Sequence, residues 1–387
     1  MTISKEFILS CSEVAKFDTE GDLELFNYAN CTNSTADELK KVRGTVFCGA
    51  ELVAQSLPYT HEFGSDECAD IQDLNGGDQL APGTLVYKAL EGTLIRIFCY
   101  EGRWYIATNR KLNAFKSRWG SNRSFGELFR EALHRCVLQS EESKEYFEVG
   151  DNITEEVCLD VFINCKLSKA NQYVFLLTSN AENRIVNCFA AESRVFFVGY
   201  FDAQRAFVQD DAEVLKHVPR AEALECSTIS EVCAAVEKMD VGKYQGAIVF
   251  TPTHHIKVLI TQYRDLSSLR GNVSNVKYRY LQIRKDDKRR RDFLQLYPES
   301  KHAFHEYERL IENFVHRVYG DYVRRFIRHE AIKVPQDQYF IMIDCHKWHQ
   351  EDRERNKISV AKVREIVNAK SAFVLNKLIR LEQELSV

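Results

Sequence analysis

The sequence predicts an α+β protein, with strands and helices mixed over residues 1–275 and a helical domain over residues 276–387. Segments rich in β-branched and aromatic residues alternate with turn signals up to about residue 280. From about residue 289, apolar residues recur at helical spacing almost to the end. The chain has 387 residues, 45% of them hydrophobic, which is enough for two or three packed domains.

The individual elements follow from local patterns. Glu101-Gly102 predicts the turn of a hairpin over residues 84–108. Ser124 and Glu127 fit a capping box at the start of a helix over residues 124–140. Strand pairs are expected over 42–57 and 246–260, the second broken at 251–253, single strands over 173–178 and 194–200, and helices over 229–238, 302–318, 322–329 and 360–384.

Composition excludes several classes of protein. No stretch approaches the roughly 20 apolar residues of a membrane span, which excludes an integral membrane protein, and we expect no membrane partner. Residues 1–22 hold one short apolar cluster and no small-residue cleavage site, so we do not expect a secreted protein. The 12 cysteines are scattered without any CxxC pair, which predicts reduced thiols and no structural zinc.

The charge is distributed unevenly along the chain. Residues 1–276 hold 28 basic and 39 acidic side chains, whereas residues 277–387 hold 24 basic and 17 acidic ones. A basic C-terminal third is typical of a surface that contacts an anion such as nucleic acid. The alternative is a basic helical domain that docks onto the acidic part of the same chain.

Four ordered segments resemble the nucleotidyltransferase core of RNA ligases of the phage tRNA-repair type. Each segment is short, and their order over about 220 residues makes the resemblance specific. The resemblance implies a mostly antiparallel core over about residues 35–275. The segments are Arg43–Phe47, Glu91–Leu94, Tyr173–Leu177 with Glu182–Val186, and Gln245–Val249 with Ile256–Tyr263.

A wider pattern resembles the iridovirus immediate-early infected-cell protein family. It consists of TLIRIF and RWYIATNRKLNAFKSRW, which begin at Thr93 and Arg103, and of KVLITQYRDLSSLRGN, which begins at Lys257 and runs into the helical tail. This resemblance implies a viral origin, synthesis early in infection, and a location in the cytoplasm or nucleus of the host cell.

The ligase resemblance also shows where this chain departs from the family. In the family, a lysine amine attacks the α-phosphate of ATP, and carboxylates hold the metal ions. The position of that lysine is Ala89 here, and the adjacent Lys88 is expected on the opposite face of its strand. Two acidic positions are Leu176 and Gln245, and the second lysine of the phosphate clamp is Leu259.

Four charged residues of the family pattern remain. They are Arg43, Glu91, Arg184 and Lys257, and the resemblance implies that they bind nucleotide or phosphate. Charged side chains are costly to bury without partners, so converging cations would attract an anion or Glu91. The alternative is that these residues only form an internal salt-bridge network.

Residues 103–123 form a basic segment without any acidic residue. Cations interleaved with aromatic rings are typical of proteins that bind single-stranded nucleic acid. The alternative is a hairpin and loop whose aromatic rings are core. The candidate patch consists of Arg110, Lys111, Lys116, Arg118 and Trp119. A second basic run, over residues 277–291, is a phosphate-contact surface, a nuclear localisation run or a solvated face.

The histidines do not predict a metal site. His254 and His255 are neighbours on an expected strand and therefore face opposite ways. His346 and His349 lie close to Cys345, but no further ligands are evident.

Three functions remain open. The leading hypothesis is an early viral protein whose degenerate cleft binds nucleotide, RNA or single-stranded nucleic acid without catalysing ligation. The second is an active ATP-dependent RNA ligase that uses Lys88, with ATP and Mg²⁺ as cofactors. The third is a structural protein with a vestigial cleft that contacts a host or viral protein.

Overall fold

The computed structural model describes residues 3–187, 192–209 and 217–385, and the chain divides into two compact units, Met1–Ser267 and Ser268–Val387. The division falls inside helix α8 (Thr261–Arg270). The boundary predicted after residue 275 falls at the N-cap of α9 (Val276–Ile283), where the Asn275 side chain accepts a hydrogen bond from the Tyr278 amide.

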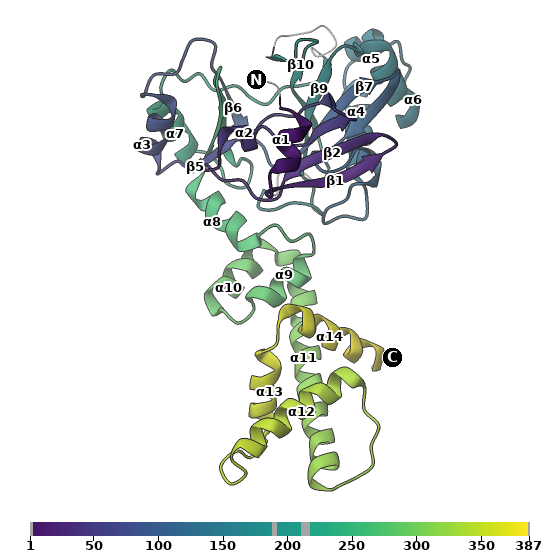
Figure 1. Cartoon of the computed structure of the whole chain (residues 1–387), viewed down its shortest axis with the longest axis vertical. Coiled ribbons are helices and arrows are strands. Elements are labelled where there is room, and N and C mark those ends of the chain that lie inside the picture. Colours follow the sequence, from purple (N-terminus) through teal and green to yellow (C-terminus); the bar gives the residue numbers. More distant parts are fainter. Residues whose placement is uncertain (1–2, 188–191, 210–216, 386–387) are drawn as a thin grey trace. The chain divides into compact units, whose positions relative to one another are not determined.

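Four antiparallel strands form the first sheet, in the order β1-β2-β3-β4. Figure 1 labels its first two strands, β1 and β2. Its inner strands β2 and β3 are buried on both faces: Leu25 and Val46 belong to one apolar cluster, and Phe26 and Phe47 to another. The expected strand pair over residues 42–57 is present as β3 and β4. The elements here are α1 (Lys5–Ser10), β1 (Val14–Glu20), β2 (Leu23–Tyr28), α2 (Asp37–Lys40), β3 (Thr45–Cys48) and β4 (Glu51–Ala54).

The second sheet is antiparallel and has the order β11-β10-β9-β7-β8. Its β7 residues Ile95 and Ile97 pack with Phe129 of α4, so the alternating Leu94 and Arg96 point to the opposite face. The elements are β7 (Gly92–Tyr100), β8 (Arg103–Ala107), η1 (Ala114–Lys116), α4 (Phe125–Leu138), α5 (Glu141–Phe147), α6 (Glu155–Val161), the π-helix η2 (Phe162–Lys166), β9 (Gln172–Thr178), β10 (Val195–Phe201) and β11 (Phe207–Val208).

The third sheet has the order β5-β13-β12-β6, with β5 parallel to β13 and the other pairs antiparallel. Helix α7 contacts β12 and β13, and α3 contacts α7 and β5. The predicted break at residues 251–253 separates β12 from β13. The elements are β5 (His61–Gly64), α3 (Cys68–Asn75), β6 (Leu85–Ala89), α7 (Ile229–Glu237), β12 (Gly246–Phe250) and β13 (His255–Leu259).

The prediction of one long strand over residues 84–100 is wrong. The segment forms β6, which ends at Ala89 in the third sheet, and β7, which begins at Gly92 in the second. Glu91 between them is only 4% exposed, and its carboxylate accepts hydrogen bonds from backbone amides of a distant loop. The apolar Leu90 continues the strand pattern, so periodicity did not reveal the change of sheet.

The unit Ser268–Val387 is helical throughout its described elements. Helices begin earlier than the residue 289 expected from the sequence, because α8 and α9 precede it. The expected helix over 360–384 is two helices, separated at Ala369–Ser371. The remaining elements are α10 (Asp287–Leu296), η4 (Pro298–Ser300), α11 (Lys301–Tyr322), the π-helix η5 (Val323–Ile327), α12 (Gln336–Glu351), α13 (Val360–Asn368) and α14 (Ala372–Leu385).

Several local predictions are confirmed. The α+β class holds, with mostly antiparallel sheets followed by a helical C-terminal region. The capping box of Ser124 and Glu127 begins α4, and the Glu101-Gly102 turn joins β7 to β8, where Tyr100 pairs with Arg103. Among the described helices, none has the length and apolar character needed to cross a membrane.

Candidate functional site

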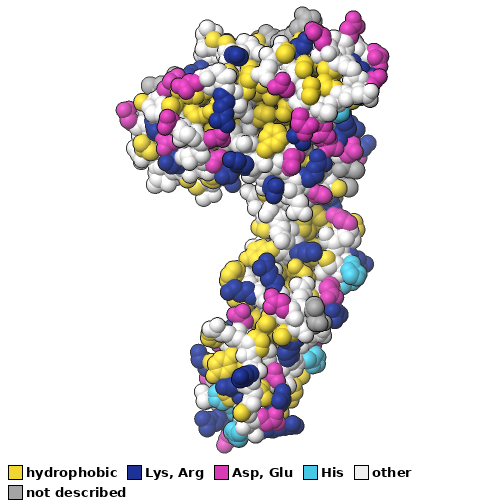
Figure 2. Space-filling view, turned by 90° about the vertical axis from the view of Figure 1, so that its right-hand side faces the viewer, with side chains coloured by type: hydrophobic (Ala, Val, Ile, Leu, Met, Phe, Trp, Pro, Cys, Tyr) yellow, Lys and Arg dark blue, Asp and Glu magenta, His cyan; other side chains and the backbone are white. Residues whose placement is uncertain are grey.

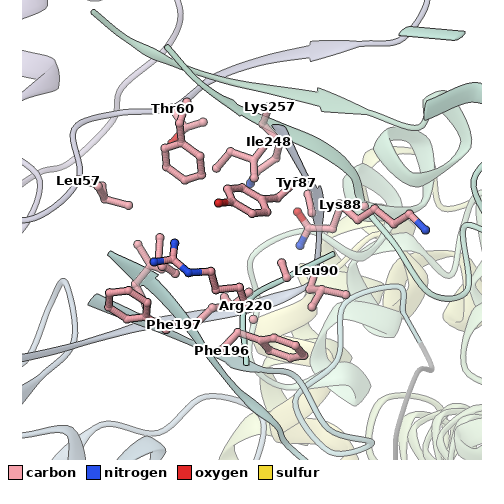
Figure 3. A pocket seen from close by; sticks show the side chains of 18 of the residues that line it. Leu57, Thr60, Tyr87, Lys88, Leu90, Phe196, Phe197, Arg220, Ile248 and Lys257 are labelled. Carbon is pink, nitrogen blue, oxygen red and sulfur yellow. The ribbon is translucent and has the colours of Figure 1, made fainter. Parts of the chain in front are cut away.

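A cavity of about 220 Å³, called the cleft below, is lined by residues from the second and third sheets (Figure 3). The third sheet contributes Tyr87, Lys88, Ala89, Ile248, Phe250 and Lys257. The second sheet contributes Leu94, Leu176, Phe196 and Val198. Loop and strand-end residues complete the lining, among them Arg43, Leu57, Thr60, Asn109, Arg220 and Gln245.

Strand register places two of the altered ligase positions in one row. Ala89 pairs with Gly246, and Gly246 pairs with Leu259. The next row on the same face joins Tyr87, Ile248 and Lys257. Ala89 and Leu259, the positions predicted to correspond to the nucleophile and to the second clamp lysine, therefore share the face of Tyr87 and Lys257, and both carry apolar side chains.

Lys88 does not take the place of the missing nucleophile. Its amine lies 2.6 Å from the Glu222 carboxylate and 5.0 Å from the centre of the Tyr244 ring. Figure 3 shows its side chain extending away from the cavity. The hydrogen bond to Glu222 raises the pKa of Lys88, which keeps the amine protonated. A nucleophilic lysine requires the opposite change, because only the neutral amine attacks.

The opposite wall is apolar at the position where the resemblance predicts an acid. Leu94 pairs with Leu176, and Leu176 pairs with Phe196, so the three form one row. All three line the cleft. Leu176 stands where the resemblance predicts a metal-binding acid. Its side chain lines the cavity and has no oxygen atom that could bind a metal ion.

Arg43 reaches the cleft from the turn that precedes β3. Its guanidinium donates to the Pro58 carbonyl over 3.3 Å. Gly44 has φ +65°, and an added Cβ would lie 3.1 Å from the Asn109 Cα, so glycine is needed at this turn. The sequence motif Arg43-Gly44 is thus explained by backbone geometry that places Arg43.

A second arginine, Arg96, supports the same turn from within the core. It is 2% exposed, and its guanidinium donates to the carbonyls of Gly44, Gln55 and Thr108, the last over 2.8 Å. Burial, with the nearby Arg43 charge, lowers the pKa of Arg96 to about 9, so it remains charged at neutral pH. Its Nε is buried without a hydrogen-bond partner.

Arg220 is a cleft residue that sequence reasoning missed. Its guanidinium lies 4.8 Å from the centre of the Phe197 ring, and Figure 3 shows it across the cavity from Lys257 and Tyr87. Arg220 belongs to none of the four motifs and lies outside every regular element, so no local signal identified it.

Lys257 lines the cleft and also contacts an acid on the neighbouring strand. Its amine lies 3.0 Å from Glu62 of β5, and this charge lowers the pKa of Glu62. Glu62 is half exposed and is not part of the lining. Indeed, within the described residues, no acidic side chain lines the cleft.

Glu91 and Arg184 lie outside the cleft lining, although the sequence predicted them there. The Glu91 carboxylate accepts hydrogen bonds from the amides of Ile185, Val186 and Asn187, the last two at 2.8 and 3.1 Å. Arg184 belongs to this bound loop and is 5% exposed. The two motif segments are therefore joined by hydrogen bonds from the backbone of one loop to a buried carboxylate.

The basic segment of residues 103–123 gains acidic neighbours from distant elements. Lys111 lies 3.1 Å from Asp18 of β1, and Arg103 pairs with Glu20 of the same strand. Arg110 stacks on the Phe17 ring and remains exposed. Lys116 and Arg118 are also exposed, whereas Trp119 is half buried.

The second basic run begins in α9 and continues in α10. Arg284 is 9% exposed and pairs with Glu308, so it belongs to the core of the helical unit. Lys285, Lys288, Arg289 and Arg291 are exposed. Figure 2 shows Lys and Arg side chains spread over the visible face of the helical unit, mixed with Asp and Glu.

The histidines are placed as core and partly buried residues. His61, His254 and His255 lie near one another, with 6.1 Å between the rings of His61 and His254. His346 stacks on Phe326, with ring centres 4.4 Å apart. In the described part of the chain, no group of three or more His, Cys, Asp and Glu side chains could hold a metal ion.

Comparison of the sequence with known proteins finds viral relatives. An immediate-early protein ICP-46 homolog of Invertebrate iridescent virus 6 is 26% identical over 370 residues, covering 91% of this chain and 77% of that protein. A homolog of Invertebrate iridescent virus 3 is 28% identical, over 75% of this chain and 61% of that protein. Frog virus 3 ICP-46 is 28% identical over 119 residues, 30% of this chain and 28% of that protein. The predicted resemblance to these iridovirus proteins is confirmed, while no protein-family model matches the chain.

Comparison of the structure finds ligases. An archaeal ATP-dependent RNA ligase has a TM-score of 0.40 at 11% identity, covering 75% of this chain and 69% of that one. A putative ATP-dependent DNA ligase from Aquifex aeolicus has a TM-score of 0.40 at 12% identity, covering 88% and 86%. A Naegleria gruberi RNA ligase mutant with ATP and Mn has a TM-score of 0.33 at 10% identity, covering 54% and 58%.

Proposed function

We propose that the cleft binds a nucleotide, free or as the phosphorylated end of a nucleic-acid strand, and does not become covalently nucleotidylated. The supporting observation is the combination of Arg43, Lys257 and Arg220 with apolar and aromatic walls, in a lining that has no acid among the residues the structure describes. Cations of this kind bind phosphate, and aromatic and aliphatic walls suit a base and ribose. The similarity to viral immediate-early proteins supports a role early in infection.

The absence of covalent transfer rests on the strand register. Ala89, the position predicted for the nucleophile, lines the cleft, and Lys88 is paired with Glu222. A ligase that uses Lys88 would have to break that ion pair, deprotonate the amine and bring the side chain to the opposite face of β6. We therefore favour binding over the active-ligase hypothesis.

Binding is tested with a fluorescent ATP analogue and with a fluorescent RNA that carries a 5′-phosphate, both followed by anisotropy. Replacing Arg43 or Lys257 by Met should weaken binding about tenfold to a hundredfold, because each removes a charge-assisted contact of about 1.5–3 kcal/mol. The 5′-hydroxyl form of the same RNA separates recognition of the phosphorylated end from general attraction to the strand.

Lys16→Met is the matched control for Lys257→Met. Lys16 also lies on a strand and pairs with one carboxylate, that of Glu24 at 2.9 Å, but it is outside the cleft. Its replacement should leave binding unchanged. Equal binding by the wild type and both cleft variants would refute the proposal, and thermal melts show whether each variant is folded.

A further inference from the structure

We infer that this cleft neutralises the charge of its phosphate ligand with its own side chains and needs no divalent cation. The inference rests on the proposed function and concerns how the same cleft binds. It separates this chain from metal-dependent nucleotidyl transfer, in which acidic residues hold the ions that contact the phosphates.

The residues present do not fit a divalent cation. Such ions prefer carboxylate oxygens, and two candidate positions on the cleft lining are Leu176 and Gln245. The third, Glu91, has both oxygens occupied: one accepts from the Ile185 amide, and the other accepts from Val186, Asn187 and the Tyr263 hydroxyl. No acid from any described element remains on the lining to hold an ion.

Cations instead surround the space that a phosphate would occupy. Arg43, Arg220 and Lys257 line the cleft from three separate segments of the chain. Lys257 shares its charge with Glu62, which lies at the sheet edge rather than in the lining. Among the described residues that line the cleft, no carboxylate lies beside these three cations.

The buried guanidinium of Arg96 adds to the positive electrostatic potential of the cleft. Arg96 contacts three backbone carbonyls, and no acidic side chain lies among its hydrogen-bond partners. Arg43 is close enough to disfavour the charged form of Arg96. A phosphate beside Arg43 would relieve this repulsion, since an anion offsets both positive charges.

The experiment measures binding of the fluorescent ATP analogue in excess EDTA and in Mg²⁺. We expect the two dissociation constants to agree within about threefold, with the weaker binding in Mg²⁺, because the ion reduces the negative charge that the protein recognises. Titration with Mn²⁺ alone, followed by its paramagnetic resonance signal, should show no tight site.

The substitution Gln245→Glu tests whether an added carboxylate makes binding depend on Mg²⁺. The backbone of Gln245 bonds to Ala89 and Ile260, and the substitution leaves these bonds intact. The added carboxylate should weaken binding about tenfold in EDTA, and Mg²⁺ should restore part of the loss, because the ion can then bridge carboxylate and phosphate. Gln245→Met is the matched control without added charge and should show no response to Mg²⁺.

The outcomes separate the two proposals. Binding that Mg²⁺ restores after EDTA has abolished it overturns this inference and leaves the proposed function standing. Tight Mn²⁺ binding by the protein alone also overturns it. Absence of binding in both buffers overturns the proposed function, and with it this inference. Equal binding in both buffers, together with metal dependence gained only in Gln245→Glu, supports the inference.

Discussion

The Tyr263 hydroxyl donates a hydrogen bond to the buried Glu91 carboxylate over 3.1 Å. Tyr263 lies in α8, the first helix after β13, and Glu91 lies between β6 and β7. The same carboxylate accepts the three amides of the 185–187 loop. The Glu91 side chain thereby connects α8 and the 185–187 loop to the segment between β6 and β7.

Replacing Glu91 by Gln should destabilise the N-terminal unit by about 2–4 kcal/mol, because the new amide group places a donor against amide donors in a buried site. Urea unfolding followed by tryptophan fluorescence measures the loss. Tyr263→Phe removes one bond and should cost about 1 kcal/mol. The exposed Glu51→Gln is the control and should stay within about 0.5 kcal/mol of the wild type.

No covalent nucleotide adduct should form on the wild-type protein. The cleft-facing position is Ala89, and the amine of Lys88 is held protonated by Glu222. Radiolabelled ATP and GTP, with Mg²⁺ or Mn²⁺, are resolved on a denaturing gel. A labelled band that is lost in Lys88→Ala would restore the active-ligase hypothesis.

Arg96→Lys should destabilise the fold by about 2–4 kcal/mol even though the charge is kept, because one amine cannot serve the carbonyls of Gly44, Gln55 and Thr108. Urea unfolding tests this. If the variant were as stable as the wild type, the planar geometry of the guanidinium would not be what holds the Arg43-Gly44 turn.

Stability should fall as the pH is lowered from about 6.5 to 4. Burial, with the charges of His254 and Arg43, lowers the pKa of His255 to about 4. Between these pH values, the unfolded chain binds a proton at His255 and the folded chain does not, so acid favours unfolding, by about 3 kcal/mol in total. His61 and His254, whose pKa values are also lowered by burial, act in the same direction.

The variant His255→Phe isolates this effect. The ring of His255 packs against Phe250, with ring centres 4.8 Å apart, so an apolar ring fits the surroundings. Unfolding free energies at a series of pH values should show a shallower slope for the variant between pH 6.5 and 4. Parallel curves for variant and wild type would mean that His255 titrates normally in the folded protein.

RNA binding, if it extends to the basic segment of residues 103–123, should depend on its exposed cations. Neutralising Arg110, Lys116 and Arg118 together should flatten the dependence of log affinity on log salt by about two units, at about 0.7 per phosphate contact for single strands. Arg103→Gln is the control, because Arg103 is already paired with Glu20. An unchanged slope would mean that the basic segment, including Lys111 and Trp119, does not contact the RNA.

The sequence by itself determined the elements whose signals are local. The Ser124 and Glu127 capping box begins α4 because both groups lie within one turn. The break at residues 251–253 separates β12 from β13 because turn-forming residues determine the backbone conformation locally. The strand motifs contain Arg43 and Lys257, and both line the cleft.

Only the tertiary structure decided the roles of the charged groups. Glu91 and Arg184 carry motif residues, yet Glu91 bonds to a loop backbone and Arg184 is buried within that loop. Arg220 lines the cleft although it belongs to no motif. Asp18 and Glu20, on a strand far earlier in the chain, pair with Lys111 and Arg103 of the basic segment. A charge acts over several ångströms of space rather than along the sequence, so its partner is set by which strands and loops the fold brings together.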